Sequence, residues 1–346
     1  MGFAVVPTPA TLDANGLATA WFPPRIFPTY SADGVHWHQG KQLKVAADTQ
    51  IEVFRSVIEG PGGLVAVGWT GACDSEWVDS LWTSTDGISW KAVDINKAFG
   101  ASAAIAHISG GAAGYVAVNY RDNALNQGGE TWTSKDGRIW QPVPLNSAAF
   151  NQSLVDDGSA VAGSFVLAGT AGDGSCDVSV GPQPTPVLRT ASIWWSADSS
   201  TWTRVALPGA VASAQSGTMS VCRLDDHAIV VSSSLGGTWG SNDGRTWRSI
   251  KLPIDVAGNV ITGGQQSLVV EFVGKDPAAP AKILMRSIDD NFALVPIAQK
   301  GSVPSRIGSV DWTMNPSSYG LLAIGPTGVL VTNATGTRLW FGEPSE

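Results

Sequence analysis

Short runs of β-branched and small apolar residues recur along the chain, each bounded by glycine, serine, asparagine or aspartate. They lie at 63–68, 114–119, 164–169, 228–233, 267–272 and 320–325. Runs of about six such residues are typical of β-strands buried on both faces. No window longer than about twelve residues keeps apolar residues at helical spacing, so the pattern predicts an all-β protein.

A polar segment ending in an aromatic residue follows each run or precedes the first. Five copies share a serine, an aspartate two positions later and a tryptophan four positions after that. They are SADGVHW ending at Trp37, STDGISW at Trp90, SKDGRIW at Trp140, SADSSTW at Trp202 and SNDGRTW at Trp247. Degenerate copies end at Phe292 and Trp340. Successive copies are 45 to 62 residues apart, which is the size of a four-stranded propeller blade.

The segment itself is typical of a hairpin turn. The aspartate can accept hydrogen bonds from the turn's own N–H groups, the glycine supplies positive φ, and the tryptophan can bury its ring beside the next strand. A carboxylate repeated in identical turns favours a structural over a catalytic role. We interpret the following residues as structural turn residues: Asp33, Asp86, Asp136, Asp198 and Asp243.

These patterns predict a single β-propeller over residues 1–346, with seven four-stranded antiparallel blades, or six as the alternative. The blades end near Trp37, Trp90, Trp140, Trp202, Trp247, Phe292 and Trp340. The segments FAVV and LATAWF before the first copy leave two options open. Either they complete the first blade, or FAVV closes the seventh as its outer strand.

The repeated segments resemble the Asp-box, or BNR, repeats of sialidases, xyloglucan-cleaving glycosidases, sortilin-type receptors and photosystem II assembly propellers. The copies here have one residue fewer between aspartate and tryptophan than the commonest form. The resemblance implies the fold, while the same turn occurs in enzymes and in binding proteins. A sialidase would carry its first substrate-binding arginine in an Arg-Ile-Pro motif, but Arg25 stands in PRIFP, where Phe27 interrupts it.

A glycoside hydrolase with two carboxylates remains the alternative, because its acid and base can come from any two blades. Adjacent pairs occur at Asp156-Asp157, Asp225-Asp226 and Asp289-Asp290. We interpret them as solvated turn residues, and His107 as an isolated histidine. No histidine and cysteine cluster has metal-ligand spacing, so neither a metal nor a cofactor is expected.

Departures from the repeat mark the expected binding surface. Insertions at 69–80, 120–130 and 170–190 fall between the second and third strands of their blades, hence on the rim opposite the Asp boxes. Aromatic and charged residues there suit a sugar ring or a partner protein. The candidate binding residues are Trp69, Asp74, Trp77, Asp79, Tyr120 and Arg121.

Cys73 and Cys176 lie in two of these insertions and could form a disulfide, which would place the protein in an oxidising compartment. Cys222, in the strand-like segment MSVCRL, is expected to be a buried thiol. The first residues lack a signal-peptide pattern. This leaves either a cytoplasmic protein or one whose signal or anchor segment lies outside this sequence. Because the Asp-box repeats that the segments resemble are frequent in exported proteins, we expect the second, with a secreted, periplasmic or cell-envelope location.

The composition of the chain argues against two classes of partner, nucleic acid and a membrane-spanning environment. The formal net charge is −8, which disfavours a nucleic-acid partner. No apolar stretch reaches the roughly 18 residues of a membrane-spanning helix. The prediction is thus a non-catalytic, monomeric recognition or scaffold module that binds a protein or glycan at the rim opposite the Asp boxes.

Overall fold

The computed structural model describes the following residues: 3–5, 11–12, 18–20, 29–31, 38–41, 51–71, 78–100, 105–119, 130–172, 188–213, 217–223, 228–234, 236–251, 261–264, 267–272, 282–288, 294–296, 322–325, 328–332 and 339–342. The structure is built almost entirely of antiparallel strands. This confirms the all-β prediction. None of the helices in these residues is long and apolar enough to cross a lipid bilayer.

Five of the sheets have four strands, each paired with the next strand in the chain. The first consists of β6 (Ile51–Gly60), β7 (Gly63–Gly71), β8 (Val78–Ser84) and β9 (Lys91–Val93). The second consists of β10 (Ile105–Gly111), β11 (Gly114–Asn119), β12 (Thr131–Ser134) and β13 (Gln141–Pro142), and the third of β14 (Ser153–Val161), β15 (Ser164–Gly172), β16 (Arg189–Ser196) and β17 (Thr203–Ala206). The fourth consists of β18 (Met219–Arg223), β19 (Ile229–Ser233), β20 (Thr238–Ser241) and β21 (Arg248–Ser249), and the fifth of β22 (Ile261–Gly264), β23 (Ser267–Phe272), β24 (Lys282–Ile288) and β25 (Leu294–Pro296).

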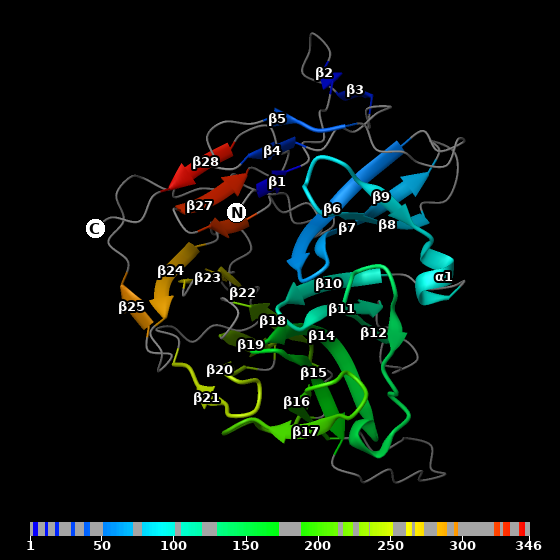
Figure 1. Ribbon diagram of the computed structural model, residues 1–346. Helices are drawn as coiled ribbons and strands as arrows, with labels where there is room; N and C mark the ends of the chain where they lie inside the picture. The colour runs from blue at the N-terminus through cyan, green and yellow to red at the C-terminus, as the bar shows by residue number, and fades with distance from the viewer. Residues whose placement is uncertain are drawn as a thin grey trace.

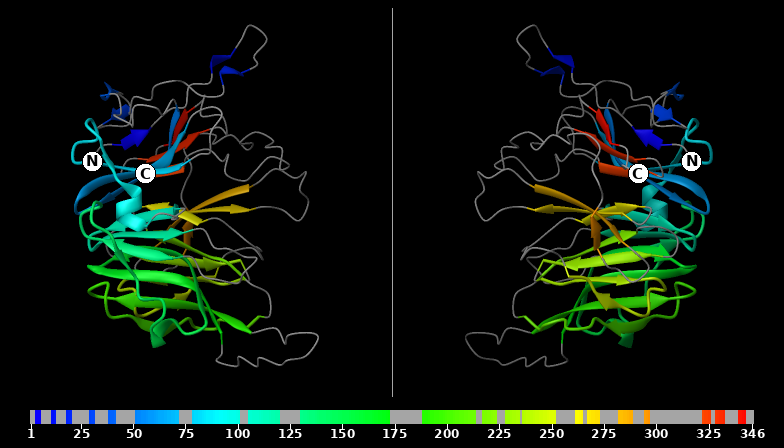
Figure 2. Two further views of the ribbon diagram at one scale, coloured as in Figure 1. Left: turned by 90° about the vertical axis from the view of Figure 1, so that its right-hand side faces the viewer. Right: turned by 90° about the vertical axis from the view of Figure 1, so that its left-hand side faces the viewer.

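The described strands near the chain ends form three smaller sheets. The strands are β1 (Phe3–Val5), β4 (Thr29–Ser31) and β5 (His38–Gln39); β2 (Thr11–Leu12) and β3 (Ala18–Ala20); and β26 (Leu322–Gly325), β27 (Gly328–Thr332) and β28 (Leu339–Gly342). Strand β1 pairs with β4, so FAVV belongs to the first sheet. LATAWF does not join it, because β3 pairs with β2 in a ribbon that projects from the other sheets (Figure 1, Figure 2).

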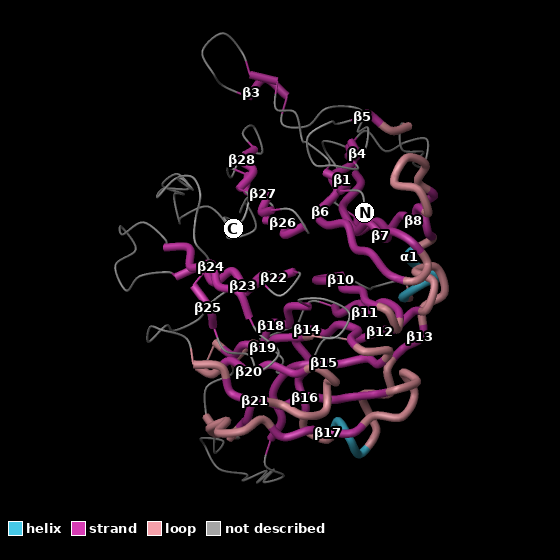
Figure 3. Tube along the Cα trace, turned by 60° about the vertical axis from the view of Figure 1, so that its left-hand side comes forward, coloured by secondary structure: helices cyan, strands magenta, loops and turns pink. Residues whose placement is uncertain are grey.

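The sheets follow one another in chain order around a common centre (Figure 1). The first strand of each four-stranded sheet lies nearest that centre, as the tube view shows (Figure 3). Strand β6 contacts β10, β10 contacts β14, β14 contacts β18, β18 contacts β22, and β22 contacts β26. Because successive strands alternate in direction, the links from β8 to β9 and their equivalents lie on one rim. The links from second to third strands lie on the other.

The core fills the spaces between successive sheets. Between the sheets of β6–β9 and β10–β13, Val65 and Leu81 pack with Ile108 and Trp132. Similar clusters of aliphatic and indole side chains fill the next two spaces. Among the second strands whose side chains are described along their whole length, every residue of β15 and β19 is buried, as is every residue of β11 except Asn119. This agrees with the prediction from the apolar runs.

Short helical turns connect some sheets and complete this packing. The helix α1 (Ile95–Phe99) and the 3-10 helix η1 (Ala148–Phe150) each end in a buried phenylalanine. The Phe99 ring lies 5.1 Å from that of Trp132, and the Phe150 ring stacks at 5.3 Å on that of Trp194. Each of these two connecting segments therefore packs one phenylalanine ring against a tryptophan of the next sheet.

Candidate functional site

Each described Asp box is a closed hydrogen-bonded turn. In the second copy, which ends at Trp90, the Asp86 Oδ1 accepts from the N–H groups of Ile88 and Ser89, both at 2.8 Å. The Ser84 hydroxyl accepts from the Gly87 N–H at 2.9 Å, and the Trp90 indole donates to the Gly87 carbonyl at 3.1 Å. The same set recurs around Asp136, Asp198 and Asp243.

The backbone of these turns explains the glycine. Gly87, Gly137 and Gly244 have φ of 71°, 74° and 71°, whereas Ser199 occupies the same place in the fourth box with φ of 67°. A side chain in this left-handed region costs about 1 kcal/mol relative to glycine. The hydrogen-bonded turn thus holds Ser199 at a positive φ, although a serine prefers a negative one.

Hydrogen bonding in the turn stabilises the ionised carboxylate. The N–H groups of Ser89 and Ile88 lower the pKa of Asp86 from its ordinary value, and those of Thr201 and Ser200 lower the pKa of Asp198. A general acid needs the opposite shift. Asp33 of the first copy lies outside the described residues.

A second polar network joins the innermost strands. The His107 Nδ1 lies 2.6 Å from the Asp157 Oδ1, so an exposed imidazole on β10 pairs with a mostly buried carboxylate on β14. Asp157 also accepts from its neighbour's N–H, that of Gly158, at 2.7 Å and from the Val221 N–H on β18 at 2.7 Å. One carboxylate therefore links three sheets. The Ser109 hydroxyl adds a hydrogen bond to the Gly158 carbonyl.

Two further aspartates accept hydrogen bonds from buried backbone N–H groups at the start of the next innermost strand. Asp156 Oδ2 accepts from the Met219 N–H at 3.0 Å, and Asp79 Oδ2 accepts from the Ile105 N–H at 2.8 Å. The interpretation of Asp156 and Asp157 as solvated turn residues was wrong, as was that of His107 as isolated. The pattern hid them because they lie at a β-bulge inside the strand, where the simple alternation of faces breaks.

Counting from the hairpin would have found this network. A register shift occurs at the same place in β6, β10 and β14, and the first paired residues after it are Ser56, His107 and Asp157. Each stands four residues before the last residue of its strand. Equivalent positions on neighbouring innermost strands face one another around the centre, so a histidine beside an aspartate at this position predicts their contact.

The structure describes only part of the predicted binding set. Trp69 and Asp79 are register partners on β7 and β8, so these two positions come together. Strands β7 and β8 also extend into the first predicted insertion, at 69–71 and 78–80. The side chain of Trp69 and the residues Asp74, Trp77, Tyr120, Arg121, Cys73 and Cys176 lie outside what is described. Within the described residues, no three potential metal-ligating side chains come together.

Exposed apolar side chains mark the rim with the insertions. Among the described residues, the large hydrophobic side chains that are exposed are Val78, Leu188, Val211 and Ile139, at 54%, 43%, 80% and 66%. Val78 begins β8, Leu188 precedes β16, and Val211 lies in the connection from β17 to β18. These three are on the rim opposite the boxes, and Ile139 is in a box.

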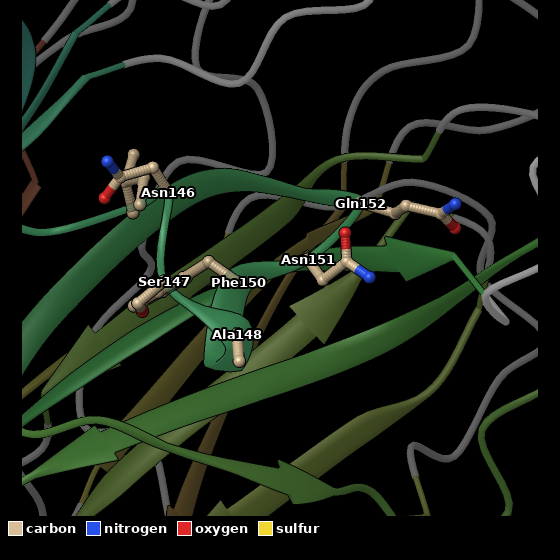
Figure 4. Close-up of a pocket in the computed structure, with 7 residues that line it drawn as sticks. Asn146, Ser147, Ala148, Phe150, Asn151 and Gln152 are labelled. Carbon is tan, nitrogen blue, oxygen red and sulfur yellow. The ribbon is translucent and has the colours of Figure 1, made fainter.

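A pocket opens on this rim in the connection from β13 to β14. Asn146, Ser147, Ala148, Phe150, Asn151 and Gln152 line it. Asn146 and Ser147 stand on one side of the η1 turn, with Asn151 and Gln152 on the other (Figure 4). The lining offers amide and hydroxyl groups over an apolar floor and holds no ionisable side chain.

Comparison with known proteins identifies the fold. The chain matches no protein-family model and no curated protein sequence. Its structure is similar to the β-propeller domain of the Trilobed protease from Pyrococcus furiosus, with 11% identity and a TM-score of 0.50, covering 100% of this chain and 91% of that chain.

Weaker likenesses extend to other propeller-containing proteins. The acylaminoacyl peptidase of Pyrococcus horikoshii gives a TM-score of 0.46 at 12% identity, covering 87% of this chain and 44% of that chain, so the present chain spans less than half of that peptidase. The six-bladed fucose lectin of Aleuria aurantia gives 0.39 at 11% identity, with coverages of 85% and 95%. With its antiparallel four-stranded sheets and its likeness to the protease domain, the chain has the fold of a β-propeller.

Proposed function

We propose that this protein is a non-catalytic recognition module that binds a protein or glycan partner at the rim opposite the Asp boxes. The observation that carries the proposal is the uneven exposure of apolar side chains. Val78, Leu188 and Val211 flank the links on that rim, whereas the box rim exposes Ile139. Exposed apolar groups beside polar loops are typical of binding surfaces.

The engagement of the carboxylates supports a non-catalytic role. The described box aspartates hold their own turns, and Asp156, Asp157 and Asp79 hold neighbouring strands. A glycosidase needs a carboxylic acid with a raised pKa beside a second carboxylate in an open cleft. The box carboxylates have lowered pKa values instead.

The finer architecture is also a proposal. The described four-stranded sheets, together with the sheets containing β4 and β27, correspond to the seven repeated segments, so we propose seven blades and a single domain. The Cys73–Cys176 disulfide and the extracytoplasmic location remain proposals as well. An experimental structure with six sheets around the centre would contradict the blade count.

Matched surface variants test the function. Leu188→Asp and Val211→Asp place charge on the proposed rim, and Ile139→Asp places it on the box rim as the control. Wild type and variants are screened on glycan and extracellular-protein arrays, and bound ligands are titrated. We expect the first two variants to weaken binding about tenfold or more, and the control to bind like wild type. Equal binding by all variants, or hydrolysis of chromogenic glycosides by the wild type, would contradict the proposal.

A further inference from the structure

A pair of side chains that can change its charge near neutral pH joins two innermost strands. The His107 Nδ1 on β10 lies 2.6 Å from the Asp157 Oδ1 on β14. The side chain of His107 is 44% exposed and that of Asp157 is 13% exposed. Protons from solvent therefore reach the imidazole, while the carboxylate lies in a partly desolvated site where a charge interaction is screened less.

The other contacts of Asp157 decide which atom of the pair donates. Its Oδ1 accepts from the Gly158 N–H and its Oδ2 from the Val221 N–H, both at 2.7 Å. Backbone N–H groups can only donate, and donors on both oxygens favour the ionised carboxylate. The His107 Nδ1 is therefore the donor in this contact, whether the imidazole is neutral or carries a second proton.

Contacts that do not titrate hold the two strands together. A Cβ on Gly111 would collide with the Ala160 carbonyl, so the backbones of β10 and β14 approach closely at their ends. The Ser109 hydroxyl on β10 also donates to the Gly158 carbonyl on β14. Protonation of His107 therefore changes the strength of a contact that is already formed.

The neighbouring strands carry a negative net charge. The titratable or charged residues of β14 and of the strands packed against β10 and β14 are Glu52, Arg55 and Glu59 on β6, Tyr115 on β11, Asp156 and Asp157 on β14, and Cys222 and Arg223 on β18. Burial raises the pKa of Tyr115 and of Cys222 to about 12, so both are uncharged at neutral pH. Carboxylates therefore outnumber guanidinium groups on these strands, and their net charge attracts a positive imidazolium.

We propose that His107 and Asp157 form a proton-dependent clasp between the second and third four-stranded sheets, which tightens when the pH falls into the mildly acidic range. A histidine side chain without other influences gains its second proton at about pH 6.5, and a charge-assisted hydrogen bond is stronger than a neutral one.

The sign of the effect follows from the partner. The unfolded chain offers the imidazolium no fixed carboxylate, so the added stabilisation is present at mildly acidic pH and is lost as the pH rises. Because Asp157 also binds the Val221 N–H on β18, the clasp extends to the fourth sheet. It acts on the ring of sheets and goes beyond the proposed binding function.

Amide hydrogen exchange at Val221 measures the clasp. The Met219 N–H on the same strand is bound by Asp156 at 3.0 Å and is the internal control. Protection factors, corrected for the intrinsic pH dependence of exchange, are measured from pH 8 to pH 5.5. We expect the protection factor of Val221 to rise about threefold relative to that of Met219 as the pH falls, which is the size expected for a half-exposed ion pair.

Two variants and one spectrum identify the group that titrates. His107→Asn keeps a side-chain N–H donor but cannot gain a proton, so the ratio should stay constant over the same pH range. His38→Asn removes an exposed histidine on β5, in another sheet, and should behave like wild type. Nitrogen-15 NMR of wild type at pH 8 should show neutral His107 protonated on Nδ1.

The outcomes are decisive for the clasp alone. A constant ratio in wild type, an equal rise in His107→Asn, or neutral His107 protonated on Nε2 would overturn it. The wild-type exchange and the NMR spectrum need no substitution, so they decide the matter even if His107→Asn does not fold. The proposed function is tested by ligand binding to the rim variants and stands or falls separately.

Discussion

The Asp-box turns and the network around His107 both use aspartate to bind backbone N–H groups, but over very different distances in the chain. Asp86 binds donors two and three residues away. Asp157 binds the Val221 N–H 64 residues away and pairs with His107 from another sheet. The box therefore stabilises one hairpin, whereas Asp157 stabilises the arrangement of three sheets.

A repeated box aspartate therefore stabilises only its own turn, whereas the single Asp157 stabilises contacts between sheets. Each box is closed by hydrogen bonds within its own turn, so we expect the loss of one box to leave the others intact. Asp157 has no described equivalent that pairs with a histidine, so its loss affects contacts that no other repeat supplies.

The largest expected effect is that of Asp157→Ala. It leaves the N–H groups of Gly158 and Val221 without their acceptor and removes the partner of His107. We expect a loss of about 3 kcal/mol in the free energy of unfolding, measured by urea denaturation. His107→Ala is the control and should cost less, because Asp157 then keeps both N–H donors. Equal losses would place the energy in the contact between His107 and Asp157 alone.

A single box should matter less. Asp86→Ala removes the acceptor of two turn N–H groups near the surface, and we expect a loss of about 1 kcal/mol in the same measurement. Combining it with Asp243→Ala should give additive losses, since the two boxes lie in different sheets. Asp86→Asn keeps one acceptor oxygen and should cost less. A strongly non-additive double variant would show that the boxes are coupled.

Lowering the pH should remove the stabilisation that the ionised box aspartates provide. The folded state lowers the pKa of Asp86 and Asp198 through turn hydrogen bonds, so it binds their protons less tightly than the unfolded chain does. The stabilisation is present above pH about 4, the unfolded value, and is lost as the pH falls through the folded values. Melting temperatures measured from pH 6 to pH 2 should fall less steeply for Asp86→Asn than for wild type. Parallel curves would contradict this assignment.

Replacing the strained residue of the fourth box should be mildly stabilising. Ser199 has φ of 67° where the three other described boxes have glycine. Ser199→Gly removes the strain but adds unfolded-state freedom, so we expect a net gain of about 0.5 kcal/mol. Gly87→Ser is the reciprocal control and should be destabilising in a thermal melt. A destabilised Ser199→Gly would show that the serine side chain contributes more than its backbone costs.

Counting reactive thiols tests the assignments of the three cysteines without changing any residue. Cys222 is buried, and burial followed by the nearby Asp157 raises the pKa of its thiol to about 12. It should not react with a thiol reagent in the folded protein at neutral pH. If Cys73 and Cys176 form the proposed disulfide, unfolding without a reductant should expose one thiol, and unfolding with a reductant all three. Three reactive thiols without a reductant would contradict the disulfide.

Some structural features of this protein could be predicted from short stretches of its sequence. The buried second strands and the turn around Asp86 both depend on neighbouring residues, so spacing alone predicted them. The Cys222 prediction succeeded for the same reason, since a small apolar side chain in an apolar strand is expected to be buried.

The amino-acid sequence by itself determined the all-β class, the antiparallel four-stranded unit and the turn that closes it, because each depends on contacts within a few residues or between consecutive strands. The tertiary structure decided that His107 meets Asp157, that Asp79 and Asp156 bind the next innermost strand, and that Asn146 and Asn151 share a pocket. Those neighbours belong to separate sheets or lie on opposite sides of a turn. Their distances follow from how the sheets pack around the centre, and a pattern within one strand shows such a contact only when it is combined with the order of the sheets.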